Sequence, residues 1–237
     1  MSAGTVSYEG SDLEVLADMP NYYSWIMETF GPHVRGDVVE YGAGIGTVSQ
    51  RLAPLATTLT LVEPSANLIP SLVERFNPAG HVKVVNALLE DHVATLSEQS
   101  IDTLVLVNVL EHIEDDSAAL GAMLRALRRG GNLLIFVPAL QFLMSRLDRM
   151  LGHFRRYHRP DLIQKVSAAG GSVKTCKYVD VFGVGPWLLL NTLLRNTGFN
   201  PALVALNDRY AVPLSKGFES LVPAPFGKNL ILVAEKP

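Results

Sequence analysis

Cysteine, net charge and long apolar runs are all scarce in this sequence. Cys176 is the single cysteine among 237 residues, so the chain can form no intramolecular disulfide and offers no cysteine cluster for zinc. Acidic residues outnumber lysine and arginine by 23 to 20 and the sequence pI is about 6.1, which argues against a broad surface for nucleic acid. The most apolar late stretch, residues 184–194, is far shorter than the roughly 20 residues of a membrane-spanning helix, and no signal-peptide pattern is found. We therefore expect a cytoplasmic protein with neither a membrane span nor a nucleic-acid partner.

What the sequence does contain is an alternation of apolar, strand-length runs and helical segments. Five strands are predicted in the first part of the chain, at residues 38–41, 59–63, 82–85, 101–107 and 133–137. Helices are predicted between them, including one that Ser65 caps and one that ends at Arg128-Arg129-Gly130-Gly131. This order predicts an α/β, Rossmann-like, doubly wound sheet with helices on both faces and with ligands at the carboxyl ends of its strands.

The last third of the chain is less regular. Two further strands are predicted, at residues 173–181 and 230–234, which makes seven. The stretch of about 45 residues between them has helical fragments and several prolines, and it is longer than a hairpin needs. We expect a single domain over residues 1–237, with a helical N-terminal segment at 1–35 and cap insertions at about 138–160 and 182–227.

The strongest local signal is the glycine loop Gly42-Ala43-Gly44-Ile45-Gly46, which lies between a predicted strand and a predicted helix. Glycines at this point let the backbone turn tightly and approach a ligand. Glu63 ends the next predicted strand about 20 residues later, where a carboxylate can accept hydrogen bonds from both hydroxyls of a ribose. A dinucleotide fingerprint would require its third glycine at Thr47, whereas here it comes one residue earlier. The loop and the acid therefore indicate an adenosine-type ligand, and the spacing of the glycines disfavours a dinucleotide.

An acidic residue, Glu40, followed by this G-x-G-x-G loop resembles the first motif of class I S-adenosylmethionine (SAM)-dependent methyltransferases. The resemblance extends over about residues 20–140 and includes the segment Asn108-Val109-Leu110-Glu111-His112, which is similar to the family's VLEH segment beside the bound methyl group. It implies a mostly parallel sheet with an antiparallel last strand, SAM as cofactor and S-adenosylhomocysteine as product.

The resemblance also implies which residues bind SAM. Glu40 and the glycine loop would hold the methionine part, Glu63 the ribose, and the segment after the third strand the adenine. Asn86 stands where the family usually has aspartate, and Tyr22 lies on a helix of the kind that folds over SAM. The full set is Tyr22, Glu40, Tyr41, Gly42, Ala43, Gly44, Gly46, Glu63, Pro64, Ser65, Asn86, Ala87, Leu88, Leu89, Asn108 and Val109.

A second motif, Gly152-His153-Phe154-Arg155-Arg156-Tyr157, is similar to the GHxRRY segment of a subgroup of small class I methyltransferases. Arg155 and Arg156 are predicted to bind an anionic acceptor through bidentate contacts. His112, His153 and Tyr157 are the catalytic candidates, because each side chain can exchange a proton. Two alternatives stay open: the segment can be an exposed basic loop before the next helix, and His112 can serve only to position SAM.

The predicted activity is methyl transfer to a small-molecule acceptor, with oxygen as the acceptor atom. Transfer to nitrogen or carbon and a non-catalytic SAM-binding subunit are the alternatives. No metal site is predicted, because the acids Glu111, Glu114, Asp115 and Asp116 precede a helix, and helix N-termini collect acids. The apolar residues 182–190 can cover an acceptor, form the interface of a homodimer or belong to the core.

Overall fold

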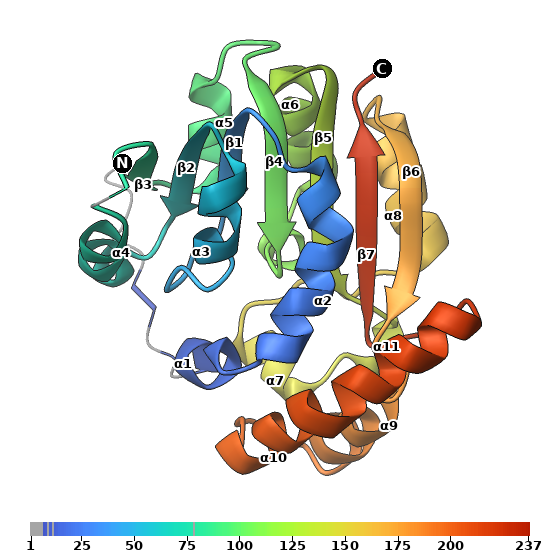
Figure 1. The fold of residues 1–237 in the computed structure, drawn as a ribbon. Helices are drawn as coiled ribbons and strands as arrows, with labels where there is room; N and C mark the ends of the chain where they lie inside the picture. Colours follow the sequence, from blue (N-terminus) through green and yellow to red (C-terminus); the bar gives the residue numbers. More distant parts are fainter. Residues whose placement is uncertain (1–6, 9, 11, 78) are drawn as a thin grey trace.

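The computed structural model describes residues 7, 8, 10, 12–77 and 79–237, and its centre is one seven-stranded sheet of order β3-β2-β1-β4-β5-β7-β6 (Figure 1). The strands are β1 (Asp37–Tyr41), β2 (Thr58–Glu63), β3 (Val82–Asn86), β4 (Ile101–Val107), β5 (Leu127–Pro138), β6 (Ser172–Val179) and β7 (Asn229–Glu235). β1 to β5 pair in parallel, while β7 runs antiparallel to both β5 and β6. The predicted fold class is confirmed, including the antiparallel last strand.

Helices cover both faces of the sheet. They are α1 (Asp12–Ala17), α2 (Pro20–Phe30), α3 (Ser49–Leu52), α4 (Ile69–Phe76), α5 (Leu89–Thr95), α6 (Asp116–Ala126), α7 (Arg146–Met150), α8 (Arg159–Ala168), α9 (Val184–Trp187), α10 (Pro201–Leu206) and α11 (Val212–Leu221). The apolar side chains of α2, α3 and α4 pack on one face, and those of α5, α6 and α8 on the other. An apolar core lies on each face of the sheet, and alternate residues of β4 belong to different cores. Leu104 and Leu106 pack in the core with α5, α6 and α8, and Val105 packs in the core with α2, α3 and α4.

The boundary between α6 and β5 differs from the prediction. α6 ends at Ala126, and the predicted helix end Arg128-Arg129-Gly130-Gly131 lies within β5. Gly130 donates its N–H to the Lys236 carbonyl at 2.7 Å, and the Arg128 guanidinium pairs with Asp37 at 3.1 Å. These partners are distant in sequence, so they extend the strand through residues whose local pattern indicates a helix end.

The helix after β2 also begins differently from the prediction. A single 3₁₀ turn, Ala66–Leu68, separates Ser65 from α4, and the Ser65 side chain makes no capping hydrogen bond. The backbone N–H of Ser65 donates instead to the Glu63 carboxylate at 2.9 Å. The predicted cap at Ser65 is therefore wrong.

The segment after β6 is helical. One π-helical turn, Leu188–Leu193, continues α9, and a second, Asn207–Ala211, joins α10 to α11. Figure 1 shows these helices, with α1 and α7, at the end of the sheet to which the β4 arrow points. A ligand bound at the carboxyl ends of the parallel strands would therefore lie between the sheet and these helices.

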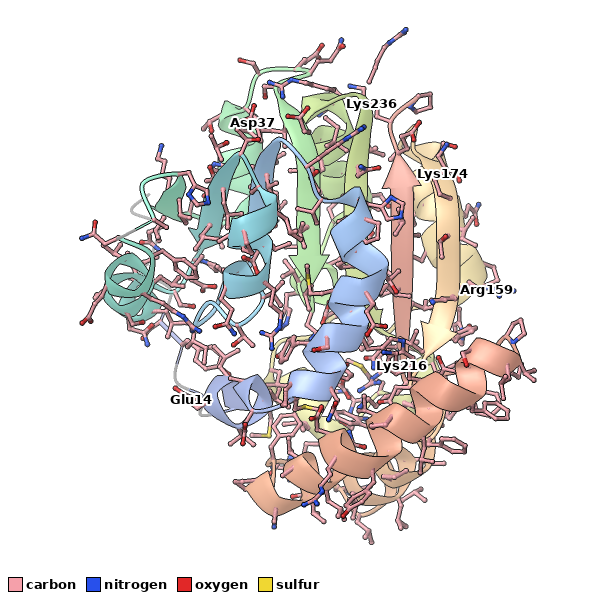
Figure 2. The ribbon with its side chains drawn as sticks, in the orientation of Figure 1. Glu14, Asp37, Arg159, Lys174, Lys216 and Lys236 are labelled. Carbon is pink, nitrogen blue, oxygen red and sulfur yellow. The ribbon has the colours of Figure 1, made fainter. Side chains whose placement is uncertain are left out.

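The N-terminal helices are tied to that segment. The backbone N–H of Tyr22 in α2 donates to Asp208 at 2.9 Å, and Lys216 of α11, labelled in Figure 2, pairs with Glu28 at 2.6 Å. Of the expected N-terminal segment 1–35, residues 1–6, 9 and 11 lie outside the described residues. In the part of the chain that the structure describes, no helix has the length and apolar character needed to cross a membrane.

Candidate active site

The glycine loop leaves β1 in a conformation that needs glycine at two points. Gly42 and Gly46 have φ of +69° and +84°, in the left-handed region that L side chains rarely adopt. A Cβ at Gly42 would lie 2.4 Å from Cγ2 of Val109, and one at Gly46 would lie 2.7 Å from Cε2 of Phe76. The loop is therefore held tightly between the segment after β4 and helix α4.

Two carboxylates flank this loop and have different surroundings. Glu63 accepts hydrogen bonds from the backbone N–H of Gly44 at 2.8 Å and of Ser65 at 2.9 Å, so it ties the loop to the end of β2. Glu40 is only 2% exposed, and its Oε2 has no hydrogen-bond partner among the described residues. Burial raises the pKa of Glu40 to about 8. A buried carboxylate oxygen without a partner beside the glycine loop fits the methionine part of SAM, which carries a cationic amino group and which the resemblance assigns to this position.

Asn86 lies at the end of β3, where the resemblance implies adenine. Its side-chain amide donates to the carbonyls of Glu63 at 2.9 Å and Pro64 at 3.0 Å. The next two leucines differ in exposure: the Leu88 side chain is exposed, whereas Leu89, the first residue of α5, is buried in the core. The amide of Asn86 thus joins the carboxyl ends of two neighbouring strands.

A cavity of about 800 Å³ opens beside the glycine loop, a volume within the usual range for small-molecule sites. It extends from the loop, past the carboxyl ends of β4 and β5, to the helical segment 184–221. The predicted site residues that line it are Tyr22, Glu40, Gly42, Ala43, Gly44, Asn108, His112, His153 and Arg156. The predicted residues outside its lining are Tyr41, Gly46, Glu63, Pro64, Ser65, Asn86, Ala87, Leu88, Leu89, Val109, Arg155 and Tyr157.

The two tyrosines predicted to contact SAM lie differently. Tyr22 faces the cavity, with its ring edge against Phe136 and its hydroxyl accepting a hydrogen bond from Asn229 at 3.0 Å. The Tyr41 side chain points into the core, where its hydroxyl lies 3.2 Å from Nδ1 of His92. Only the first ring is therefore placed to meet a ligand in the cavity.

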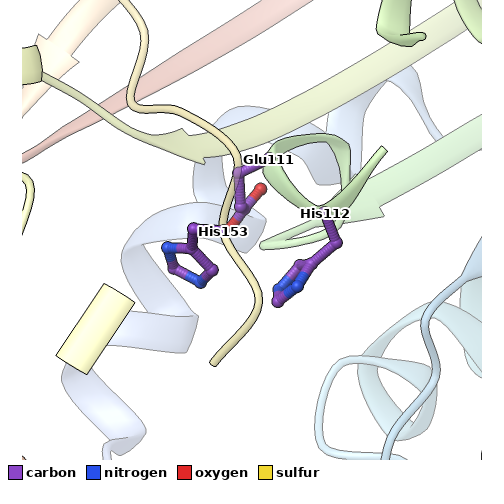
Figure 3. Close-up of side chains that lie close together, drawn as sticks. All are labelled: Glu111, His112 and His153. Carbon is purple, nitrogen blue, oxygen red and sulfur yellow. The ribbon is translucent and has the colours of Figure 1, made fainter. Parts of the chain in front are cut away.

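Two histidines that line the cavity lie side by side (Figure 3). The rings of His112 and His153 lie edge to face, with centroids 4.6 Å apart and planes at 89°. Nδ1 of His153 lies 3.0 Å from a carboxylate oxygen of Asp148. Desolvation, and then the neighbouring His153, lower the pKa of His112 to about 4, although this residue keeps an exposed surface.

Glu111 lies beside these histidines, and sequence reasoning did not predict a role for it. Its side chain is fully buried, and no other described residue donates a hydrogen bond to either of its carboxylate oxygens. Burial raises the pKa of Glu111 to about 7. Together with His112 and His153 it forms a group of three side chains that could hold a metal ion, at a place where no metal was expected.

Arg156 is held by the protein. It is 5% exposed, and its Nε and Nη2 lie 3.0 and 2.7 Å from one oxygen of Asp148. Its Nη1 donates to the Ala139 carbonyl at 3.3 Å, and the guanidinium carbon lies 4.6 Å from the centre of a Trp187 ring. The guanidinium lines the cavity, yet most of its hydrogen bonds are used to fix Asp148.

Arg155 and Tyr157 point away from the cavity and meet at Asp116. Nη1 of Arg155 lies 2.7 Å from the Asp116 carboxylate, and Nη2 donates to the Glu114 carbonyl at 2.7 Å. The Tyr157 hydroxyl donates to the Asp116 carboxylate at 2.8 Å and lies 3.1 Å from the Leu110 carbonyl oxygen. Burial, and then Asp116, raise the pKa of Tyr157 well above its usual value. These contacts connect residues after α7 to the beginning of α6.

Sequence reasoning missed several polar residues around the cavity. Asp148 could have been noticed, because Ser145 and Asp148 form a capping box at the start of α7 and fix that carboxylate. Lys228, which pairs with the fully buried Asp180 at 2.8 Å, gives no local signal. Its ammonium lies within 5.8 Å of the Trp187 ring centre, on the wall of the cavity.

Comparison with known proteins agrees with this geometry. The family model of a methyltransferase domain matches residues 16–170. No curated protein sequence matches the chain. A solved SAM-dependent methyltransferase from Mesorhizobium loti has a TM-score of 0.65 at 13% identity, over 93% of this chain and 100% of that one.

Two further solved structures share the fold. The N-methyltransferase NodS from Bradyrhizobium japonicum, crystallised with S-adenosylhomocysteine, has a TM-score of 0.63 at 14% identity, over 97% of this chain and 94% of that one. The cyclase SpnF has a TM-score of 0.60 at 18% identity, over 91% and 80%. The family match spans more than half of the chain and the glycine loop provides the binding features, so the chain belongs to the methyltransferase-domain family and its cofactor is SAM.

Proposed function

We propose that the protein transfers the methyl group of SAM to an oxygen atom of a small-molecule acceptor that carries a sizeable apolar part. One observation carries the proposal: a single cavity joins the glycine loop to the paired histidines and to the apolar helical segment 184–221. SAM brings an already electrophilic methyl carbon. The task left to the chain is to hold the acceptor oxygen in line with the breaking bond, which is proximity and orientation work.

On the cofactor side, we assign the charge recognition to Glu40. Its buried carboxylate can pair with the amino group of SAM, and the backbone N–H groups of the loop can bind the carboxylate. Glu63 keeps a role toward the ribose, because each carboxylate oxygen has a second lone pair beyond the one used by Gly44 or Ser65. The segment Asn86–Leu89 remains the proposed adenine site.

On the acceptor side, the wall of the cavity indicates an apolar partner. Phe182, Trp187, Leu190, Phe199 and Leu203 line it. A flat ring or a chain of several carbons would bury apolar surface there, and each buried CH₂ favours binding by about 0.8 kcal/mol. We do not assign anion recognition to Arg155 or Arg156, whose guanidinium groups are engaged by Asp116 and Asp148.

Within the cavity, we propose that the acceptor hydroxyl lies against the paired histidines and loses its proton there. His153 is the better oriented of the two, because the Asp148 carboxylate fixes its Nδ1 and leaves Nε2 for the acceptor. Tyr157 is left out of this step, because its hydroxyl is bound to Asp116 and Leu110 outside the cavity.

The proposal is tested with methyl-labelled SAM and a panel of hydroxylated aromatic and long-chain compounds, each paired with its amine analogue. We expect labelled methyl ethers. His153→Asn should lower kcat by at least about tenfold with an unchanged Kd for SAM, and His158→Asn, outside the cavity, should behave as wild type. Labelled amines alone would contradict the oxygen assignment. SAM binding without transfer to any compound would support a non-catalytic SAM-binding subunit.

A further inference from the structure

Three potential metal ligands from two segments of the chain lie close together beside the cavity, whose lining includes two of them, His112 and His153. Glu111 and His112 lie on the 3₁₀ turn Leu110–His112 after β4, and His153 lies after α7 (Figure 3). One ligand atom from each lies within 4.8 Å of the others. Ligands bound to one ion at about 2.0–2.2 Å lie roughly 3–3.5 Å apart, so small side-chain movements would close the site.

The carboxylate of Glu111 is without a partner. It is fully buried, and neither of its oxygens receives a hydrogen bond from any other described residue. A buried carboxylate is unfavourable unless a cation or several donors compensate it. The nearby guanidinium of Arg156 is committed to Asp148 and Ala139. A bound cation would supply the compensation that Glu111 lacks.

Both histidines have partners of the kind that accompany metal-binding histidines. Nδ1 of His153 lies 3.0 Å from the Asp148 carboxylate, and the Leu151 backbone is an electrostatic partner of the His112 ring, where it opposes the lowering of the pKa by desolvation. The contact with Asp148 occupies one ring nitrogen of His153 and leaves the other with a lone pair. Carboxylate and carbonyl partners of this kind fix the tautomer and direction of metal-ligating imidazoles.

We propose that Glu111, His112 and His153 bind a divalent transition-metal ion, such as Zn²⁺, Mn²⁺, Fe²⁺ or Co²⁺. Two imidazoles and one carboxylate suit this class of ion, whereas Mg²⁺ and Ca²⁺ prefer oxygen ligands throughout. Both histidines line the cavity, so an ion held by them would border the space that we propose for the acceptor.

The ion has a chemical role that rests on the proposed function, although its binding does not. An acceptor hydroxyl bound to the ion would lose its proton to solvent more readily, because a divalent ion lowers the pKa of a bound O–H group. The oxygen then forms a bond to the methyl carbon as the sulfur–methyl bond breaks, leaving S-adenosylhomocysteine. In the ion-loaded protein the metal, rather than His153, activates the hydroxyl.

The binding test uses the full chain, stripped with a chelator and titrated with Co²⁺. We expect one Co²⁺ per chain with a visible absorption spectrum of nitrogen and oxygen coordination, and competition by Zn²⁺. Glu111→Gln and His153→Asn should each weaken Co²⁺ binding at least about tenfold and lose that spectrum. His158→Asn is the matched control and should bind Co²⁺ as wild type does. Circular dichroism and the Tm of each stripped variant establish that it is folded.

Some outcomes would overturn the proposal. Absence of stoichiometric Co²⁺, Zn²⁺ and Mn²⁺ binding to the folded wild type would do so, as would equal binding by wild type and both ligand variants. One Co²⁺ per chain with the expected loss in the variants would support the site even if no compound were methylated, in which case only the proposed function fails. Methyl ether formation at full rate by the stripped protein would support the proposed function and overturn the role of the ion.

Discussion

The pH dependence of SAM binding depends most directly on Glu40. Burial raises the pKa of this carboxyl to about 8, so at pH 7 only about one molecule in ten carries the charge that would pair with the amino group of SAM. A binding-competent fraction lowers the observed affinity in proportion. That fraction rises from about 0.01 at about pH 6 to about 0.24 at about pH 7.5, while the protonated fraction of an α-amino group falls to about 0.7. The affinity for SAM should therefore rise about 17-fold over this range.

The assay is a calorimetric titration of wild type and Glu40→Gln with SAM across this pH range. Glu40→Gln cannot ionise and should bind more weakly than wild type at about pH 7.5, with no rise in affinity as the pH increases. Glu219→Gln is the matched control: the pKa of Glu219 is also raised, to about 7, but this residue is outside the cavity lining. It should keep the wild-type dependence. A wild-type affinity that does not change with pH, or an unchanged pH dependence in Glu40→Gln, would show that Glu40 does not pair with the amino group of SAM.

The raised pKa of Glu40 should also affect the stability of the folded protein. A carboxyl whose pKa is higher in the folded state than in the unfolded chain stabilises the fold below the unfolded value, and that contribution is lost as the pH rises through the folded value. The unliganded protein should therefore lose stability between about pH 4.5 and about pH 8, and Glu40→Gln should reduce this loss. Urea unfolding at several pH values measures it, and an identical slope in the two proteins would count against the assignment.

Other changes test the packing around the site. Arg156→Met leaves the fully buried Asp148 without its guanidinium partner. It should therefore lower the free energy of unfolding by about 3 kcal/mol and the Tm by about 6–12 °C, and an unchanged Tm would contradict this. At Gly46 the backbone is left-handed, and a new Cβ would contact Phe76. Gly46→Ala should therefore destabilise the fold by at least about 1–2 kcal/mol in urea unfolding, and an unchanged stability would be inconsistent with the loop geometry. Leu13→Ala should weaken SAM binding about fivefold with little change in Tm, because Leu13 packs over the glycine loop, and an unchanged Kd would exclude that role.

Much of the sheet could be predicted from the sequence because its parallel strands are buried on both faces. The apolar run 101–107 coincides with β4, and the run 59–63 falls within β2. The first residues of β5 could not be predicted, because Arg128-Arg129-Gly130-Gly131 carries the local signal of a helix end. Their strand pairing depends on residues distant in sequence, such as Lys236.

The candidate site divides in the same way. The glycine loop and Glu40 are contiguous in sequence, so their pattern already indicates a nucleotide-like ligand. The group of Glu111, His112 and His153 could not be predicted, because its segments lie about 40 residues apart and meet only through the path of the chain after β5. The ion pair between Arg156 and Asp148 could not be predicted for a related reason. The sequence gives the charge of a side chain but not the partner that neutralises it.

Binding of SAM in the cavity beside the glycine loop is required for the proposed methyl transfer. It is tested by competitive calorimetry of the wild-type protein with SAM, S-adenosylhomocysteine and a nicotinamide dinucleotide. We expect one molecule of SAM per chain, displaced by S-adenosylhomocysteine and unaffected by the dinucleotide. Absence of SAM binding, or selective binding of the dinucleotide, would show that the cavity is not a SAM site.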